Sequence, residues 1–100
     1  DSGMRTPFIV YWPKVLKKPG ESTVSLISAI DIAPTLLSAA NVRIPPTMQG
    51  VNFLSILEEP SAVVRQVAFS EHNWHGYEAH GRSVRTDDGW LYIKNNRPQL

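Results

Sequence analysis

Residues 31–40 read Asp-Ile-Ala-Pro-Thr-Leu-Leu-Ser-Ala-Ala, and they give the clearest structural signal in the chain. Asp31 can cap the free amides of a first helical turn, and its charge suits the positive end of the helix dipole. Pro34 is tolerated in that turn because the amides there have no intrahelical partner. Ile32 and Leu36 recur at helical spacing. The sequence therefore predicts a helix that follows Asp31, continues to the end of this stretch and buries the apolar face of Ile32 and Leu36.

A short apolar run precedes this helix, since residues 7–12 read Pro-Phe-Ile-Val-Tyr-Trp between Gly3 and Pro13. Aromatic and β-branched residues follow one another without polar alternation, which is typical of a strand buried on both faces. Such a strand needs neighbouring strands and helices. We therefore expect a chain of 100 residues to leave part of its apolar surface exposed.

Three further elements are predicted after the helix. Asn52 can cap a short helix over residues 53–57, and a brief apolar strand follows at residues 67–69. Residues 82–86 and 90–94 are joined by Asp-Asp-Gly, a strong signal of a tight antiparallel hairpin. The pattern alone indicates an α/β or α+β fold that ends in this hairpin.

Length, charge and cysteine content exclude several classes of protein. A chain of 100 residues fits one small domain or a piece of a larger one, and the absence of an initiating methionine favours the piece. The formal net charge of +1 gives no electrostatic basis for binding nucleic acid. The sequence has no cysteine nucleophile or disulfide, and no apolar run approaches the ~20 residues that span a bilayer.

Reactive side chains concentrate between residues 71 and 82, which are predicted to form a loop after a strand. All the histidines lie there, together with Glu71, Glu78, Tyr77 and Arg82. Histidine can donate or accept near neutral pH, and arginine presents a planar fork to a tetrahedral oxyanion. The group suits a sulfate, a phosphate or a polar sugar, and the candidate substrate-binding residues are Glu71, His72, His75, His80 and Arg82.

Two other interpretations of this segment stay open. The loop can be an ordinary solvated surface whose histidines contact water. Alternatively, Glu71, His72, His75 and His80 could ligate zinc, although Gly76 argues against the helical spacing that many zinc sites use.

Several segments, taken in order, resemble the sulfatase family. Residues 1–13 contain its glycine-x-arginine-x-proline strand ending in tryptophan-proline, and residues 31–37 are similar to its Asp-x-x-Pro-Thr helix. Residues 50–54 resemble the glycine-x-serine-leucine region that follows this helix in the family, with Asn52 at the position where serine is usual. Residues 67–71 and 82–94 resemble the late strand and the closing hairpin. Residues 70–75, followed by residues 82–84, are most similar to the heparan N-sulfatase, or sulfamidase-like, branch.

The resemblance implies an α/β, alkaline-phosphatase-like sulfatase fold of which this chain is a C-terminal fragment. Residues 1–70 would end the α/β catalytic domain. Residues 71–100 would form a substrate-side loop and begin a small antiparallel C-terminal subdomain, with its β hairpin. The remainder of the sulfatase chain is then an expected partner.

The family hydrolyses sulfate esters or sulfamates, here implied on sulfated carbohydrates such as glycosaminoglycans. Its members use calcium and a formylglycine made from the first residue of a Cys/Ser-x-Pro-x-Arg motif, and this sequence contains neither that motif nor the metal motifs. No catalytic or metal residue is therefore assigned, and the isolated fragment is expected to be inactive. Family habit implies a periplasmic, secreted or lysosomal location.

Two alternatives to a sulfatase fragment stay open. The chain can be a non-catalytic module, or a decayed remnant of an enzyme, that binds an anionic sugar through His72 and His75. It can also belong to a related phosphatase-superfamily hydrolase, because phosphate and sulfate esters require similar anion sites.

Overall fold

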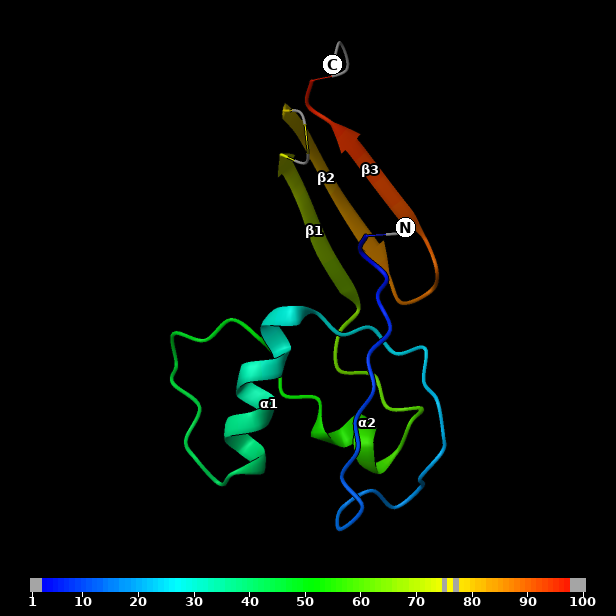
Figure 1. The fold of residues 1–100 in the computed structure, drawn as a ribbon, viewed down its shortest axis with the longest axis vertical. Helices are drawn as coiled ribbons and strands as arrows, with labels where there is room; N and C mark the ends of the chain where they lie inside the picture. The colour runs from blue at the N-terminus through cyan, green and yellow to red at the C-terminus, as the bar shows by residue number, and fades with distance from the viewer. Residues whose placement is uncertain (1–2, 75, 77, 98–100) are drawn as a thin grey trace.

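The computed structural model describes residues 3–74, 76 and 78–97. A body formed by the N-terminal two thirds of the chain contains helices α1 (Ile32–Ala39) and α2 (Leu54–Glu58), surrounded by long connecting segments. A sheet formed by the C-terminal third projects from one end of this body (Figure 1). The molecule is accordingly elongated, with extents of 51 × 29 × 24 Å.

The projecting sheet has three antiparallel strands in the order β1-β2-β3. They are β1 (Val67–Trp74), β2 (Glu78–Thr86) and β3 (Leu91–Asn95). The turn between β2 and β3 holds Gly89 at φ 102°, a conformation open to glycine because it has no Cβ. The predicted closing hairpin is confirmed.

The predicted loop over residues 71–82 is wrong for the part of it that the structure describes. Most of this segment forms the paired outer halves of β1 and β2, with Glu71 opposite Arg82 and Ser70 opposite Ser83. Opposite charges and paired hydroxyls across two strands stabilise such a ladder. The polarity of the segment suggested a loop, but these side chains satisfy one another across the strands.

The predicted strand over residues 7–12 is also wrong as a paired strand. The segment runs along the body without secondary structure and has no ladder partner among the described residues. Phe8 packs edge-on against Phe53, with ring centroids 5.9 Å apart and planes at 84°. A strand needs a neighbour to bond with, and the described part of the chain supplies none here.

The fold class is confirmed only at a coarser level than predicted. The described residues form one antiparallel three-stranded sheet and few helices, which is consistent with a sulfatase C-terminal domain. They do not show the layered α/β arrangement of the expected alkaline-phosphatase-like fold. The predicted boundary between residues 70 and 71 falls inside β1, and the division into two domains stays a prediction.

Helix α1 begins where the sequence predicts, but its leading carboxylate has a different role. Asp31 is fully buried and its carboxylate accepts no hydrogen bond from the first turn of α1, so the predicted side-chain cap is wrong. Instead its oxygens accept hydrogen bonds from the amides of Ser28 and Val51, both at 2.7 Å. The guanidinium of Arg65 binds the same carboxylate through Nε, at 3.0 Å, and Nη2. One buried charge therefore joins three segments of the body.

A second polar set ties α1 to the segment before α2. The hydroxyl of Thr35 donates to the carbonyl of Asp31 at 2.6 Å and accepts from the amide of Phe53 at 3.0 Å. Asn52 donates to the hydroxyl of Ser38 at 2.9 Å, and its side-chain oxygen accepts from the amide of Leu54 at 2.9 Å, so it satisfies the first amide of α2 from the position before the N-cap, Phe53. Both helices are thus held by side chains that satisfy buried backbone groups.

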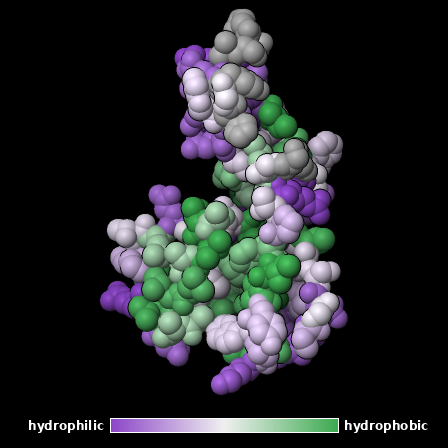
Figure 2. Space-filling view, viewed as in Figure 1, coloured by the Kyte–Doolittle hydropathy of each residue, from purple (hydrophilic) through white to green (hydrophobic). Residues whose placement is uncertain are grey.

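Little apolar surface is covered in the body. Phe53 and Ile56 are the large hydrophobic side chains buried within the described residues. Leu36 is 63% exposed, so the predicted inward face of α1 is wrong, because Pro34 and Thr35 take the buried side instead. Figure 2 shows hydrophobic residues spread over the surface of the body, as expected for a chain of this length.

We expect Asp31→Asn to lower the free energy of unfolding at pH 7 by about 3–5 kcal/mol, because Arg65, whose side chain is only 14% exposed, loses its counter-charge. Urea titration followed by circular dichroism measures this. The matched control is Glu59→Gln, which breaks the exposed ion pair with Lys18 and should change stability little. Equal effects of the two variants would contradict the anchoring role of Asp31.

The same carboxylate predicts a pH dependence. Burial raises the pKa of Asp31, but the hydrogen bonds from Arg65, Val51 and Ser28 outweigh it, and the net pKa lies below the ordinary value of 3.8. Its stabilisation is therefore complete above that value and is lost as pH falls through the lower folded-state pKa. Urea titrations between pH 5 and about 2 should show this loss in the wild type and a smaller one in Asp31→Asn.

Gly50→Ala should destabilise the body by roughly 1–3 kcal/mol through overpacking. A Cβ at this position would lie 1.9 Å from the carbonyl oxygen of Ile30 and 3.0 Å from the Cγ of Pro34. Gly3→Ala is the control, since its Cβ would meet nothing within 4 Å. The same urea titration applies, and a neutral Gly50→Ala would show that this close approach does not exist in solution.

Candidate functional site

The hairpin of β1 and β2 carries four of the five predicted site residues. Glu71 lies opposite Arg82 in the ladder, and His72 lies opposite Gly81. His80 lies on β2, near the free end of the sheet. The fifth residue, His75, lies outside the described residues.

The strand register divides these residues between the two faces of the sheet. Directly opposed residues share a face, so Glu71, Arg82 and, on β3, Lys94 form one charged row across the sheet. His72 belongs to the other face. The structure therefore brings Glu71 and Arg82 together and separates His72 from them.

Arg82 is the centre of a polar group on this face. Its Nε lies 3.4 Å from a carboxylate oxygen of Glu71, and its Nη1 donates to the side-chain oxygen of Asn73 at 2.8 Å. The same Nη1 donates to the carbonyl of Gly81, also at 2.8 Å. These contacts fix the guanidinium plane while leaving the side chain about two-fifths exposed. An oriented, accessible guanidinium is a suitable donor fork for an oxyanion.

A second polar group lies further out on the hairpin. The Nε2 of His80 is 3.0 Å from one carboxylate oxygen of Glu78, and the guanidinium of Arg97 is 2.7 Å from the other. The hydrogen bond from His80, with the positive charge of Arg97, holds the pKa of the Glu78 carboxyl below its ordinary value. Glu78 therefore positions His80. None of the contacts in this second polar group links His80 to Arg82.

A hollow of about 320 Å³ lies where the hairpin joins the body, and we call it the basal hollow. Glu71 and Arg82 contribute to its wall, so two of the predicted residues border a concave surface. Guanidinium, carboxylate and hydroxyl groups together can bind a hydroxylated, anionic ligand. Its lining residues are Ser28, Ile30, Arg65, Phe69, Ser70, Glu71, Arg82 and Ser83.

The remaining residues of the basal hollow were not predicted from the sequence. Ser70 and Ser83 are opposed across the two strands, and Arg65 lies just before β1. In a single sequence, nothing about a serine indicates whether it lines a binding site. Arg65 could have been suspected only as a counter-charge for Asp31, whose burial no local pattern revealed.

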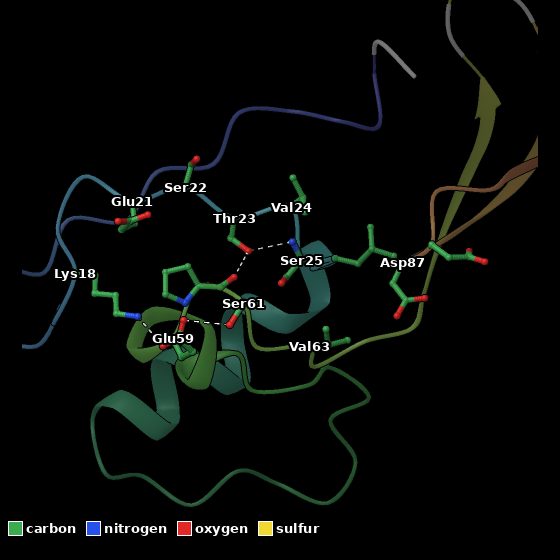
Figure 3. A pocket seen from close by; sticks show the side chains of 13 residues that line it. Lys18, Glu21, Ser22, Thr23, Val24, Ser25, Glu59, Ser61, Val63 and Asp87 are labelled. Atoms are coloured by element: carbon green, nitrogen blue, oxygen red, sulfur yellow. Dashed lines mark hydrogen bonds and ion pairs between the residues drawn. The ribbon is translucent and has the colours of Figure 1, made fainter.

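A larger hollow of about 710 Å³ lies on the body beside the turn at residues 59–63 (Figure 3). None of the predicted site residues lines it. Its polar groups bind one another, since Lys18 contacts Glu59 at 2.6 Å and Thr23 donates to the carbonyl of Pro60. Ser25 likewise donates to the carbonyl of Ala62. Glu21, Ser22, Asp87 and Asp88 also line this hollow, the last two from the turn between β2 and β3.

Metal ligation was the open alternative for the histidines. Within residues 3–74, 76 and 78–97, no three acidic or histidine side chains lie close enough together to hold a metal ion. His72 and His80 belong to different positions of the ladder, and His80 is bound to Glu78. The described residues therefore give the zinc hypothesis no support.

Comparison with known proteins identifies the family. The model of the N-sulphoglucosamine sulphohydrolase C-terminal family matches residues 1–93. An ulvan-active sulfatase of Formosa agariphila is 31% identical over 95% of this chain, and an arylsulfatase of Clostridium perfringens is 30% identical over 93%. Arylsulfatase K of Mus musculus is 27% identical over 93%. No solved structure matches.

These matches define a C-terminal region of the sulfatases. The chain belongs to the N-sulphoglucosamine sulphohydrolase C-terminal family, within a wider group of sulfate ester hydrolases. The predicted sulfatase membership is confirmed, and the matching family model carries the sulfamidase name. The chain spans about a fifth of the length of the three relatives, with 20%, 20% and 18% of them covered.

Replacing His80 tests the outer polar group of the hairpin. We expect His80→Gln to raise the pKa of Glu78 toward its ordinary value, because the hydrogen bond from His80 is the main cause of the lowering. Carbon-13 NMR titration of the Glu78 carboxyl measures it. Arg97→Gln is the comparison and should raise the pKa less; an unchanged Glu78 in His80→Gln would show that the contact does not form.

Proposed function

We propose that this chain is the C-terminal part of a sulfatase that removes sulfate ester or sulfamate groups from sulfated carbohydrates, glycosaminoglycans among them. The observation that carries the proposal is the family match over residues 1–93. The hairpin supports it, because its oriented guanidinium and adjoining hollow suit an anionic sugar.

The proposed role of the hairpin is to bind substrate beside the reaction centre. Arg82 presents its fork to a sulfate or carboxylate of the glycan, and Glu71 accepts hydrogen bonds from sugar hydroxyls. His72, His75 and His80 are proposed as further contacts along the glycan. His72 would then meet a part of the ligand on the other face of the sheet, or around its edge.

The family's calcium and formylglycine do not fit the residues of this chain. The sequence has no cysteine, and none of its serines begins a Ser-x-Pro-x-Arg motif. The described residues also hold no cluster of metal ligands. We therefore propose that both groups belong to the remainder of the sulfatase chain, and we assign no step of the reaction to this part.

The remainder of the sulfatase chain is the proposed partner, and its α/β catalytic domain is the proposed context of residues 1–70. Neither α1 nor α2, the helices of the described residues, is long and apolar enough to cross a membrane. A periplasmic, secreted or lysosomal location is proposed from the family.

Arg82→Ala in the full-length enzyme should reduce kcat/KM for a sulfated oligosaccharide about 10- to 100-fold, as expected for one charge-assisted hydrogen bond. Most of the loss should appear in KM, because the proposed role is binding. Lys94→Ala is the matched control: it lies in the same row of the sheet but outside the basal hollow. Equal effects of the two variants would contradict the proposed site.

The same preparation separates the alternatives. Turnover of 4-nitrophenyl sulfate with little turnover of 4-nitrophenyl phosphate supports a sulfatase, and the reverse supports a phosphatase-superfamily hydrolase. The 100-residue chain alone should give no turnover with or without calcium. If the native gene product gives none but binds sulfated glycans saturably, the non-catalytic binding module replaces this proposal.

A further inference from the structure

Arg65 presents one side of its guanidinium to the basal hollow. The fork formed by its Nε, at 3.0 Å, and its Nη2 binds the carboxylate of Asp31. Among the described residues no acceptor binds its Nη1, yet every buried side-chain nitrogen and oxygen there has a partner. Nη1 therefore belongs to the exposed 14% of this side chain, and Arg65 lines the hollow. A second guanidinium, besides that of Arg82, thus has donors at this surface.

The ion pair with Asp31 makes Arg65 a well-placed donor. Burial and the two hydrogen bonds already fix the side chain, so a ligand loses little side-chain entropy by binding it. Arg82 is oriented in the same way by Glu71 and Asn73. Because Asp31 and Glu71 balance the two positive charges, the hollow selects a ligand through fixed N–H donors rather than through net charge. Carboxylate and sulfate oxygens are the strongest acceptors for such donors.

An aromatic side chain adds an apolar wall to the hollow. Phe69 lies two residues before Glu71 on β1, so it shares the face of the sheet that carries Glu71 and Arg82. It is 70% exposed, and it lines the hollow at the base of the hairpin, beside residues 28–30 (Figure 1). An apolar ring next to a few placed polar groups is typical of a ligand site, and the C–H face of a sugar ring stacks well on an aromatic ring.

We propose that the basal hollow is a subsite for one anionic sugar unit of the glycan, next to the unit that is hydrolysed. Arg65 and Arg82 hold the carboxylate or sulfate of that unit, and Phe69 stacks on its ring. The volume of about 320 Å³ lies at the lower end of the ~300–1,000 Å³ of ligand pockets and suits a single unit. A reacting sulfate held here would need its nucleophile within this hollow, and the sequence has no nucleophile motif.

This subsite rests on the proposed function and adds Arg65 and Phe69 as specificity-determining residues. Kinetics of the full-length enzyme test it with a sulfated disaccharide whose second unit is a uronate, and with 4-nitrophenyl sulfate. Phe69→Leu should raise KM for the disaccharide about 3- to 10-fold more than KM for 4-nitrophenyl sulfate, with little effect on kcat, because stacking is lost while an apolar side chain remains.

Tyr92→Leu is the matched control for Phe69→Leu. Tyr92 is another exposed aromatic residue, 64% exposed, on the same face of the sheet, but it lies on β3 outside the hollow. Its replacement should leave the ratio of the two KM values unchanged. Equal ratios for Phe69→Leu and Tyr92→Leu would overturn the subsite. An equal loss with both substrates in Phe69→Leu would also overturn it, because the hollow would then act on the reacting group or on the fold.

Arg65→Lys tests the second guanidinium. Lysine keeps a positive charge for Asp31 but has no Nη1, so KM for the disaccharide should rise about 10-fold more than KM for 4-nitrophenyl sulfate. A lower thermal midpoint in this variant measures any weakening of the pair with Asp31 separately. Phe69→Leu needs no such correction, because an exposed residue contributes little to the fold. A KM ratio that Arg65→Lys leaves unchanged would overturn the role of Arg65.

Two pairs of substrates identify the anionic group. If the hollow holds a carboxylate, the methyl ester of the uronate should raise KM about 10-fold in the wild type and add little in Arg65→Lys. If it holds a sulfate, the same pattern should appear when a second sulfate is removed from a disaccharide whose second unit is otherwise neutral. No rise in KM in either pair would overturn the subsite.

Calorimetric titration of the full-length protein with the uronate disaccharide separates this inference from the proposed function. Saturable binding that Phe69→Leu weakens, in a protein without sulfatase turnover, would support the subsite and contradict the proposed activity. Turnover of 4-nitrophenyl sulfate, with disaccharide binding that neither Phe69→Leu nor Arg65→Lys weakens, would support the activity and overturn the subsite.

Discussion

The buried carboxylate of Asp31 is the interaction on which the body depends. Its hydrogen bonds come from Ser28, Val51 and Arg65, which belong to three segments far apart in the sequence. A buried charge is tolerated only when its oxygens are fully paired. The paths of all three segments are therefore constrained together, and the close approach of Gly50 to Ile30 is one consequence.

The same ion pair connects the body to the candidate site. Arg65 lies just before β1, so its attachment to Asp31 sets the point from which the hairpin projects. Arg65 and Arg82 both line the basal hollow, although only Arg82 has an accessible, oriented fork. The position of the proposed binding residues therefore depends on Arg65, whose guanidinium is bound by Asp31.

Sequence reasoning succeeded where one segment contains its own signal. The α1 helix, the cap at Asn52 and the turn at Gly89 each follow from local chemistry, and the ordered motifs identified the family. It failed where the outcome depends on a distant partner. Residues predicted as a polar loop form two strands because Glu71 pairs with Arg82 across the ladder. The burial of Asp31 requires a counter-charge 34 residues away.

Polar and apolar groups are satisfied to different degrees in this chain, and the difference has a physical cause. Among the described residues, every buried side-chain nitrogen and oxygen has a hydrogen-bond partner, yet Ile9, Tyr11 and Leu36 remain largely exposed. A buried polar atom needs a hydrogen-bond partner within about 3 Å, so a residue packed directly against it must supply that partner. Apolar burial scales with area and is non-directional, so any covering surface can supply it. The described residues therefore complete their buried polar contacts within the chain while much of their apolar side-chain surface stays exposed.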